Sequence, residues 1–306
     1  MQKRNVLNSS RLLELKKHRR RNTRNKVLFF LLGIFAIFIF LVYLSHLSSL
    51  NIQNIEITGN KIIDTDAIKT VVQGQIAGKY LWLFPKTDIF LFPENSIKSN
   101  LQDKFKRLKD IKLSIKNNKT LEVSLTERTA KYIWCGDTYV PDVGRPTSGT
   151  TTDCYFMDED GYIFDQAPYF SGEVYFKFFG LPDVQRPGIP GRWTSGDETD
   201  PSGLYFSQKN FQQLISFRDT LVSLGLKPVS LYAIKDGEID VFLSSKNSSA
   251  VGPEIKFNSD SDFQTVAENL ESALTTEPLQ LEFKNKYSSL LYIDLRFGNK
   301  VYYKFL

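Results

Sequence analysis

The sequence predicts an α+β protein with a single transmembrane helix, followed by a small β-α-α-β-β domain and a larger, mostly antiparallel α+β domain. Three observations lead to this prediction. The run Val27–Ser45 contains nineteen residues without a charge or a proline, enough to cross a bilayer. Beyond it, segments that alternate apolar and polar residues, as strands do, are interspersed with segments of helical periodicity. The order of these segments follows the layer rules of α+β domains.

The N-terminal part is read as a basic tail, residues 1–26, and a transmembrane helix, residues 27–46. The tail holds ten Lys or Arg and one acid, so it carries +9 and leaves −4 for the rest of a chain whose total is +5. The apolar run is longer than the core of a cleaved signal peptide, and no A-x-A-like site follows it. The positive-inside rule places the tail in the cytoplasm and the following domains outside. A nucleic-acid-binding arm is the competing interpretation of the tail, but topology beside a membrane span accounts for its charge.

The small domain is predicted over residues 51–127. A short strand is followed by a helix that has Asp64 as its N-cap and ends at Gly74. A second helix begins near Pro93. The apolar stripe of this second helix consists of Ile97, Leu101, Phe105 and Leu108. A hairpin around the turn sequence KNNK completes the domain.

An aromatic stretch between the two helices does not fit a single strand. Tyr80, Leu81, Trp82, Leu83 and Phe84 are consecutive, so they cannot all point inward from one strand. Two placements are open for them, against the helices of the small domain or near the lipid surface.

The larger domain is predicted over residues 128–306. Short aromatic runs separated by turn residues predict its first strands. A helix over 207–225, a hairpin around Asp236-Gly237, one more strand and a helix capped by Asp260 or Ser261 follow. Cys135 and Cys154 flank a loop rich in Gly, Pro and Thr. A disulfide here would stabilise the fold by ~3 kcal/mol in the loop-entropy model, and two unpaired thiols are the alternative.

Few residues suited to catalysis lie in the two domains. The histidines, His18 and His46, both precede them, which argues against catalytic triads and histidine-bound zinc. The chain has no CxxC, Walker A or GxGxxG pattern. The acids Asp158, Glu159 and Asp160 suggest a glycosidase pair, but adjacent acids at a turn usually face water and lack calcium-ligand spacing. The sequence therefore predicts no enzyme, no cofactor, no metal and no small-molecule substrate.

The last segment, LLYIDLRFGNKVYYKFL, predicts a hairpin with a type II′ turn at Gly298-Asn299. Ile293, Leu295 and Phe297 are expected on one face of its first strand. The final strand is either an edge protected by its lysines or a docking site for a partner strand. The candidate partner-binding residues are Phe297, Asn299, Lys300, Val301, Tyr302, Tyr303, Lys304 and Phe305.

This layout resembles the bacterial cell-division family FtsQ, called DivIB in Gram-positive bacteria. NIEITGNKII is similar to the start of the family's POTRA domain, and CYFMDEDGYIF resembles its aspartate-x-x-glycine turn. TLEVSLTERTAKYIW resembles the strand that enters the second domain, although Thr129-Ala130 stand where the family often has proline. LLYIDLRFGNKVYY, with Asp294, Leu295 and Arg296, is the most specific match. The resemblance covers essentially the whole chain; the cysteines and the loops 141–153 and 181–203 depart from it.

The resemblance implies a non-enzymatic, single-pass scaffold of the divisome, located in the plasma (inner) membrane at the septum. Its implied partners are FtsB and FtsL-type single-pass coiled-coil proteins, without nucleic acid. The POTRA domain would serve recruitment, and the final strand of the β domain would contact FtsB. The alternatives are a POTRA-bearing factor that handles secreted or unfolded polypeptides and a membrane-anchored envelope hydrolase. POTRA proteins of polypeptide transport usually carry several copies, whereas the sequence suggests one.

Overall fold

The computed structural model describes residues 10–136, 154–168, 170, 173–180, 200–207, 209–234, 237–245 and 252–306, with side chains from residue 19 onward. The chain divides into two compact units, Met1–Glu127 and Arg128–Leu306. The predicted loop 141–153, most of the loop 181–203 and Asp236 of the predicted hairpin turn lie outside the described residues.

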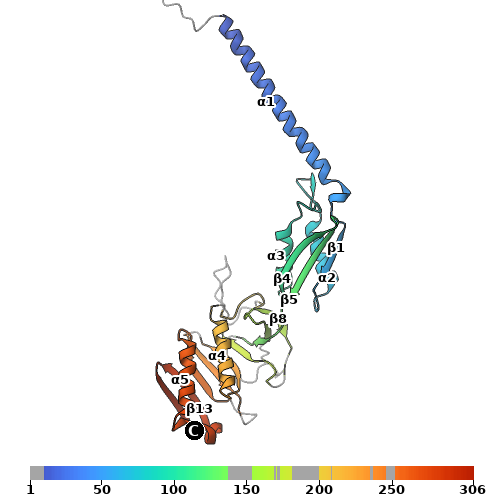
Figure 1. Ribbon diagram of the computed structural model, residues 1–306. Helices are drawn as coiled ribbons and strands as arrows, with labels where there is room; N and C mark the ends of the chain where they lie inside the picture. The colour runs from blue at the N-terminus through green and yellow to red at the C-terminus, as the bar shows by residue number, and fades with distance from the viewer. Residues whose placement is uncertain are drawn as a thin grey trace, which may run out of the picture. The chain divides into compact units, whose positions relative to one another are not determined.

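Helix α1, Ser10–Ser45, opens the first unit (Figure 1). Its segment Arg19–Ser45 is long and apolar enough to cross a membrane, and its most apolar window is not buried against the rest of the described chain. Within the described ranges, it is the one helix that meets this length and composition test. A short 3-10 turn, Ser48–Leu50, then leads into the folded part of the unit.

The folded part of the first unit is a three-stranded sheet with two helices. Its elements are β1 (Asn54–Thr58), α2 (Thr65–Ile76), β2 (Lys79–Tyr80), β3 (Phe84–Pro85), α3 (Glu94–Lys104), β4 (Leu108–Lys116) and β5 (Thr120–Glu127). The sheet order is β1-β5-β4, with β1 parallel and β4 antiparallel to β5. Ile68 and Val72 of α2 and Leu101 of α3 are fully buried in the same core as Leu121 and Val123 of β5. The strands β2 and β3 form a separate two-stranded ribbon, which the sequence did not predict.

The structure confirms some of the predicted helix and turn signals and corrects others. Asp64 caps α2, because its Oδ2 accepts the Ala67 N–H at 3.0 Å. The helix does not end at Gly74 but at Ile76, and Gly78, with φ +87°, makes the turn after it. Asn117 and Asn118 have φ values of +54° and +53°, as a type I′ hairpin turn requires.

The predicted stripe of the second helix is wrong in its last two residues. Helix α3 ends at Lys104, and Phe105 is its C-cap. Leu108 is buried, but it begins strand β4. A buried strand residue at helical spacing from Leu101 therefore extended the periodic pattern past the end of the helix.

The second unit is built on a nine-stranded sheet. Its elements are β6 (Tyr132–Trp134), β7 (Cys154–Met157), β8 (Ile163–Ala167), β9 (Lys177–Gly180), α4 (Phe211–Ser223), β10 (Pro228–Ala233), β11 (Glu238–Leu243), β12 (Glu254–Asn258), α5 (Phe263–Thr275), α6 (Leu279–Lys286), a 3-10 turn (Tyr287–Ser289), β13 (Leu290–Phe297) and β14 (Lys300–Phe305). The strand order is β14-β13-β12-β11-β10-β9-β6-β7-β8. Five neighbouring pairs are antiparallel and three are parallel.

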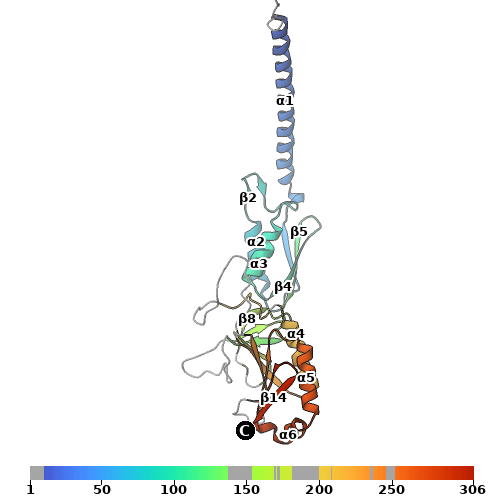
Figure 2. The same cartoon turned by 90° about the vertical axis from the view of Figure 1, so that its left-hand side faces the viewer.

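Helices α4 and α5 cover one face of this sheet (Figure 2). Phe217 of α4 and Phe263 of α5 both contact Phe257 of β12, with ring centroids 4.6 and 5.3 Å apart. The cap of α5 is neither Asp260 nor Ser261 but Asp262, whose carboxylate accepts the N–H groups of Gln264 and Thr265. The apolar stripes of both helices thus meet the inward side of the strands.

Candidate partner-binding edge

Strand β14 lies at one end of the nine-stranded sheet and pairs with β13 through a tight hairpin. Phe297 and Lys300 close a two-residue loop in which Gly298, at the first central position, has φ +65°. The side chain of Asn269 on α5 donates to the Gly298 carbonyl at 3.1 Å. The turn is therefore held both by its glycine and by the neighbouring helix.

The two faces of β14 differ in their surroundings. Val301, Tyr303 and Phe305 are half-buried and pack against the core of the unit. Tyr302 is 49% exposed on the opposite face. Lys300 and Lys304 are exposed as well. The strand is thus amphipathic with the alternation that the sequence predicts.

Phe297 does not share the buried face of Ile293 and Leu295, contrary to the prediction. Those two residues are 0% and 3% exposed, whereas Phe297 is 56% exposed. The pairing of β13 with β14 shifts between Asp294 and Phe297, which breaks the alternation at the end of the strand. The Phe297 ring instead meets Tyr302 edge-to-face, with centroids 5.2 Å apart.

The outer edge of β14 has no strand paired to it among the described residues. The Leu306 N–H, just past the strand, donates to the Ser289 carbonyl at 2.8 Å and so faces β13. Because N–H direction alternates along a strand, we infer that the N–H groups of Val301, Tyr303 and Phe305 face the open edge. These are donors that an added strand would use.

The other end of the sheet is different, because residues 203–206 run along the outer edge of β8. The Ile163 N–H donates to the Leu204 carbonyl at 2.9 Å, and the Gly203 N–H donates to the Ile163 carbonyl at 2.8 Å. Tyr162 and Tyr205 form a further bridge. Of the two end strands, β14 therefore has the more accessible edge within the described part of the unit.

A row of charged side chains on three neighbouring strands leads to this edge of the sheet; we call it the charged row. Asp240, Lys256, Asp294 and Tyr302 are neighbours in register on β11, β12, β13 and β14. The Lys256 ammonium lies 3.1 Å from Asp240 and 2.6 Å from Glu254. Burial would lower the pKa of Lys256, but the hydrogen bond to Glu254 and the charge of Asp240 raise it. The pKa of Asp240 is raised, because burial raises it and the nearby Lys256 offsets that increase only in part.

Arg296 fixes the part of this row next to β14. Its Nε and Nη2 donate to the two carboxylate oxygens of Asp294 at 2.9 and 2.7 Å. Its Nη1 donates to Glu238 at 2.5 Å. Burial would raise the pKa of Asp294, but the hydrogen bonds from Arg296 lower it below its usual value. The resemblance singled out Asp294 and Arg296; it did not single out Glu238, Asp240 or Lys256, which a cross-strand charge alternation could have indicated.

The three acids at the predicted turn do not all face water. Glu159 and Asp160 are exposed, but Asp158 is buried, which contradicts the expectation. Its Oδ1 accepts the N–H groups of Asp160 and Tyr162 at 2.9 and 3.0 Å, and its Oδ2 pairs with Arg128. The Arg128 guanidinium also lies over the Tyr162 ring, 3.7 Å from its centroid. Asp158 thus serves the fold of the turn.

Across the described ranges, no cluster of three or more His, Cys, Asp or Glu side chains is placed to hold a metal ion.

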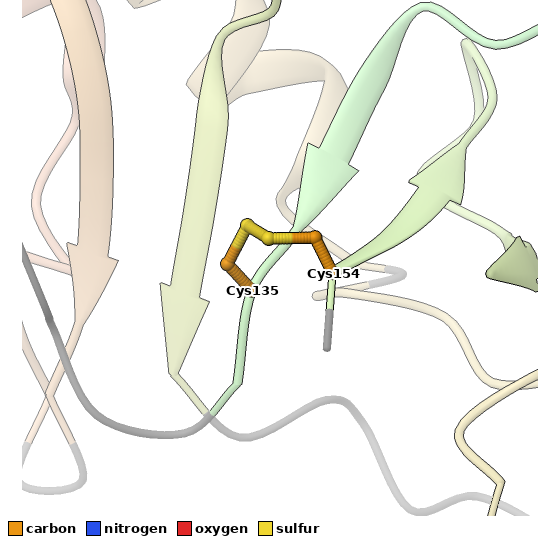
Figure 3. The surroundings of a disulfide bond; sticks show 2 residues. All are labelled: Cys135 and Cys154. Carbon is orange, nitrogen blue, oxygen red and sulfur yellow. A yellow bond between two sulfur atoms is a disulfide. The ribbon is translucent and has the colours of Figure 1, made fainter. Parts of the chain in front are cut away.

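Cys135 and Cys154 form a disulfide, which settles the alternatives left open by the sequence (Figure 3). Trp134 pairs with Tyr155 in the β6–β7 ladder, so the cysteines are the next cross-strand neighbours. Both are buried, and their Cα atoms are 4.2 Å apart. The bridge links the ends of β6 and β7 across a sequence separation of 19 residues.

Neither a protein-family model nor a curated protein sequence matches this chain.

Proposed function

We propose that this chain is a single-pass membrane scaffold that binds a partner protein by adding a strand to β14. The open edge of β14 is the observation that carries the proposal. Main-chain hydrogen bonds to the outward N–H groups would supply affinity, and the two unlike faces of the strand would supply selectivity. Phe297 and Tyr302 add exposed aromatic surface beside the strand, a type of residue that is enriched in interfaces.

The membrane anchor is the second part of the proposal. The segment Arg19–Ser45 has the length and composition of a span. The strongly basic residues before it support a cytoplasmic tail. The disulfide supports an oxidising compartment, hence an extracytoplasmic position, for the second unit.

The division role is the most specific part of the proposal and comes from the resemblance to FtsQ/DivIB. The hairpin that carries Asp294, Leu295 and Arg296 is the best-matching motif, and it forms the proposed docking edge. On this proposal the chain acts at the septum without catalysing a reaction. It would bind small single-pass coiled-coil proteins of the FtsB and FtsL type through residues 297–305.

Proline substitution in β14 tests the docking edge. In Val301→Pro, the donor that we place at the open edge is lost, while the hydrogen bonds from β14 to β13 are expected to remain. Val301→Thr is the matched control, because it keeps the N–H and the β-branched shape. Each variant is expressed as the full chain with a purification tag, and crosslinked membranes are analysed by mass spectrometry.

We expect wild type and Val301→Thr to retain a small single-pass coiled-coil protein that Val301→Pro loses. Thermal unfolding and an intact disulfide in Val301→Pro would show that its second unit is still folded. Equal capture of that protein by both variants would contradict the strand-addition model.

Depletion and localisation test the division role separately. We expect depletion of the protein to give filamentous or chained cells and a fluorescent fusion to gather at midcell. Uniform envelope fluorescence together with normal division would rule out that role and leave the edge-binding result to stand on its own.

A further inference from the structure

The first unit exposes a cluster of large apolar side chains close to the end of α1. Three of these side chains are almost fully exposed: Leu81 by 84%, Trp82 by 92% and Phe90 by 78%. We call the cluster the apolar foot; it consists of Tyr80, Leu81, Trp82, Leu83, Phe90 and Leu91. Contiguous exposed apolar surface of this kind usually marks an interaction site.

The backbone of the β2–β3 ribbon holds the tip of the foot in an unusual conformation. Leu81 and Trp82 have φ values of +47° and +62°. Asn, Asp and Gly normally occupy such left-handed turn positions, because bulky side chains are disfavoured there. The Leu83 N–H donates to the Tyr80 carbonyl at 3.0 Å, which closes the turn. The sequence therefore displays two apolar side chains where polar residues would be favoured, which suggests a role for them.

The ribbon lies beside the last turns of α1. The Phe84 ring of β3 meets the Phe38 ring of α1 edge-to-face, with centroids 5.9 Å apart. Phe38 is seven residues before the helix ends at Ser45, which is ~10 Å along the axis. The charge-free run from Val27 to Ser45 is only ~28 Å long, so it needs its full length to cross the hydrocarbon core. Phe84 therefore lies level with the outer part of a membrane around α1.

An apolar groove continues from the span into the foot. It has a volume of roughly 510 Å³ and is lined by Leu41 and Leu44 of α1 and by Tyr80, Phe84 and Phe90, among others. The buried Asp88 also lines it, and its Oδ1 accepts the Phe90 N–H at 2.8 Å. Because residues of the span form one wall, whatever surrounds the span reaches the groove as well.

Basic residues flank the foot. Lys79 is exposed, and the Lys86 ammonium lies 5.6 Å from the centroid of the Tyr80 ring. Tryptophan and tyrosine with nearby lysines are the composition of membrane–water interfaces, where the lysine heads reach the phosphates and the rings lie below them.

We propose that the apolar foot inserts into the outer leaflet of the membrane that α1 spans and that the groove accepts a phospholipid acyl chain. The first unit is then attached to the bilayer at two points, the span and the foot, which limits its rotation about the helix end. This inference rests on the membrane anchor of the proposed function, but not on the division role or on β14.

Fluorescence quenching by brominated phospholipids tests the insertion. The full chain is reconstituted into vesicles whose acyl chains carry bromine near the headgroup end. Trp82 is one of three tryptophans, so we expect bromination to remove roughly a third of the emission. In Trp82→Phe the quenching that we attribute to Trp82 should disappear. Trp82 is 92% exposed in the structure, so the substitution leaves the fold intact.

A relocated tryptophan provides the matched control. Ile62 is 69% exposed in the same unit, and it lies past the far end of β1 from the residues that join α1. In Trp82→Phe/Ile62→Trp the new tryptophan should escape the bromines. Quenching that is equal in wild type, Trp82→Phe and the relocated variant would overturn the proposal. A second outcome would also overturn the proposal. If Trp82 is unquenched in vesicles until a second membrane protein is added, the groove holds a protein and not an acyl chain.

Flotation of the same vesicles separates this result from failure of the anchor. A chain that floats with the vesicles but shows no Trp82 quenching retains its span and lacks the foot contact, which overturns only the present inference. A chain that does not float contradicts the membrane anchor itself and the present inference with it.

Discussion

Glu127 and Arg128 are consecutive in the chain, but their charged side chains stabilise different units. Glu127 makes its contacts in the first unit and Arg128 in the second. The Glu127 carboxylate accepts the N–H groups of Lys61, Ile62 and Ile63, with shortest distances of 2.8, 3.1 and 3.0 Å. The Arg128 guanidinium pairs with the buried Asp158. Burial would raise the pKa of Glu127, but these backbone hydrogen bonds lower it.

Replacing Glu127 with Gln should loosen the segment that follows β1. The amide keeps one acceptor oxygen but loses the charge, so we expect a cost of about 1–2 kcal/mol and roughly tenfold faster amide exchange at residues 61–63. The stability difference between wild type and Glu127→Gln should be present at neutral pH. It should vanish as the pH falls through the lowered pKa of Glu127, because between the unfolded and the folded pKa the unfolded state binds more protons than the folded one.

Glu56→Gln is the control for this prediction, because Glu56 forms an exposed ion pair with Lys116 at 3.5 Å, the one such contact it makes among the described residues. Its amide exchange at residues 61–63 should match wild type. Identical exchange in Glu127→Gln and Glu56→Gln would show that the carboxylate does not hold this segment.

The pair formed by Arg128 and Asp158 should behave as a coupled unit. Their side chains are 10% and 3% exposed, so Arg128→Ala leaves the buried Asp158 carboxylate without its cationic partner. We expect it to destabilise the second unit by about 3–5 kcal/mol in urea unfolding. The double variant Arg128→Ala/Asp158→Asn should lose less stability than the sum of the losses in Arg128→Ala and Asp158→Asn, and strict additivity would refute the coupling.

Removing the disulfide should weaken the second unit through the unfolded state. A loop of 19 residues corresponds to about 3 kcal/mol in the loop-entropy model. We expect Cys135→Ser/Cys154→Ser to show this loss in urea unfolding followed by tryptophan fluorescence. A reducing agent should destabilise wild type by a similar amount and leave the double variant unchanged, because the chain has no other cysteine; unchanged stability of wild type after reduction would contradict the prediction.

Asp294 should make the docking hairpin sensitive to acid. Arg296 holds its carboxylate with two hydrogen bonds, so we expect Asp294→Asn to cost about 2 kcal/mol at neutral pH. Because its pKa is lowered in the folded state, this stabilisation is fully present above the unfolded pKa and is lost as the pH falls through the folded one. Urea unfolding at a series of pH values measures it. The exposed Glu271→Gln serves as the control and should be nearly neutral throughout.

Local signals in the sequence predicted individual elements well where one physical rule dominated. Asp64 caps its helix and the KNNK turn has two left-handed asparagines, because each signal acts within a few residues. The apolar run before Ser45 likewise forms one helix, since nothing interrupts its composition.

Three of the errors arose where tertiary pairing overrode a local pattern. Leu108 continues a helical period, yet pairing with Glu127 places it in a strand. A register shift turns Phe297 outward. Arg128, thirty residues away in sequence, allows Asp158 to be buried at a turn where acids usually face water. The charged row of Asp240, Lys256 and Asp294 depends on strand order and register, which no local pattern specifies.

The alternation of apolar and polar side chains along β14 limits the register in which a partner strand can pair with it. Val301, Tyr303 and Phe305 extend the apolar side of the sheet, while Tyr302 prolongs the charged row. A guest strand that slid by a single residue would turn its apolar side chains toward the charged row and its polar ones toward the core. The edge of β14 therefore accepts a partner strand in few of the possible registers. A one-residue insertion in the partner strand should weaken binding as much as removing the side chains that contact β14.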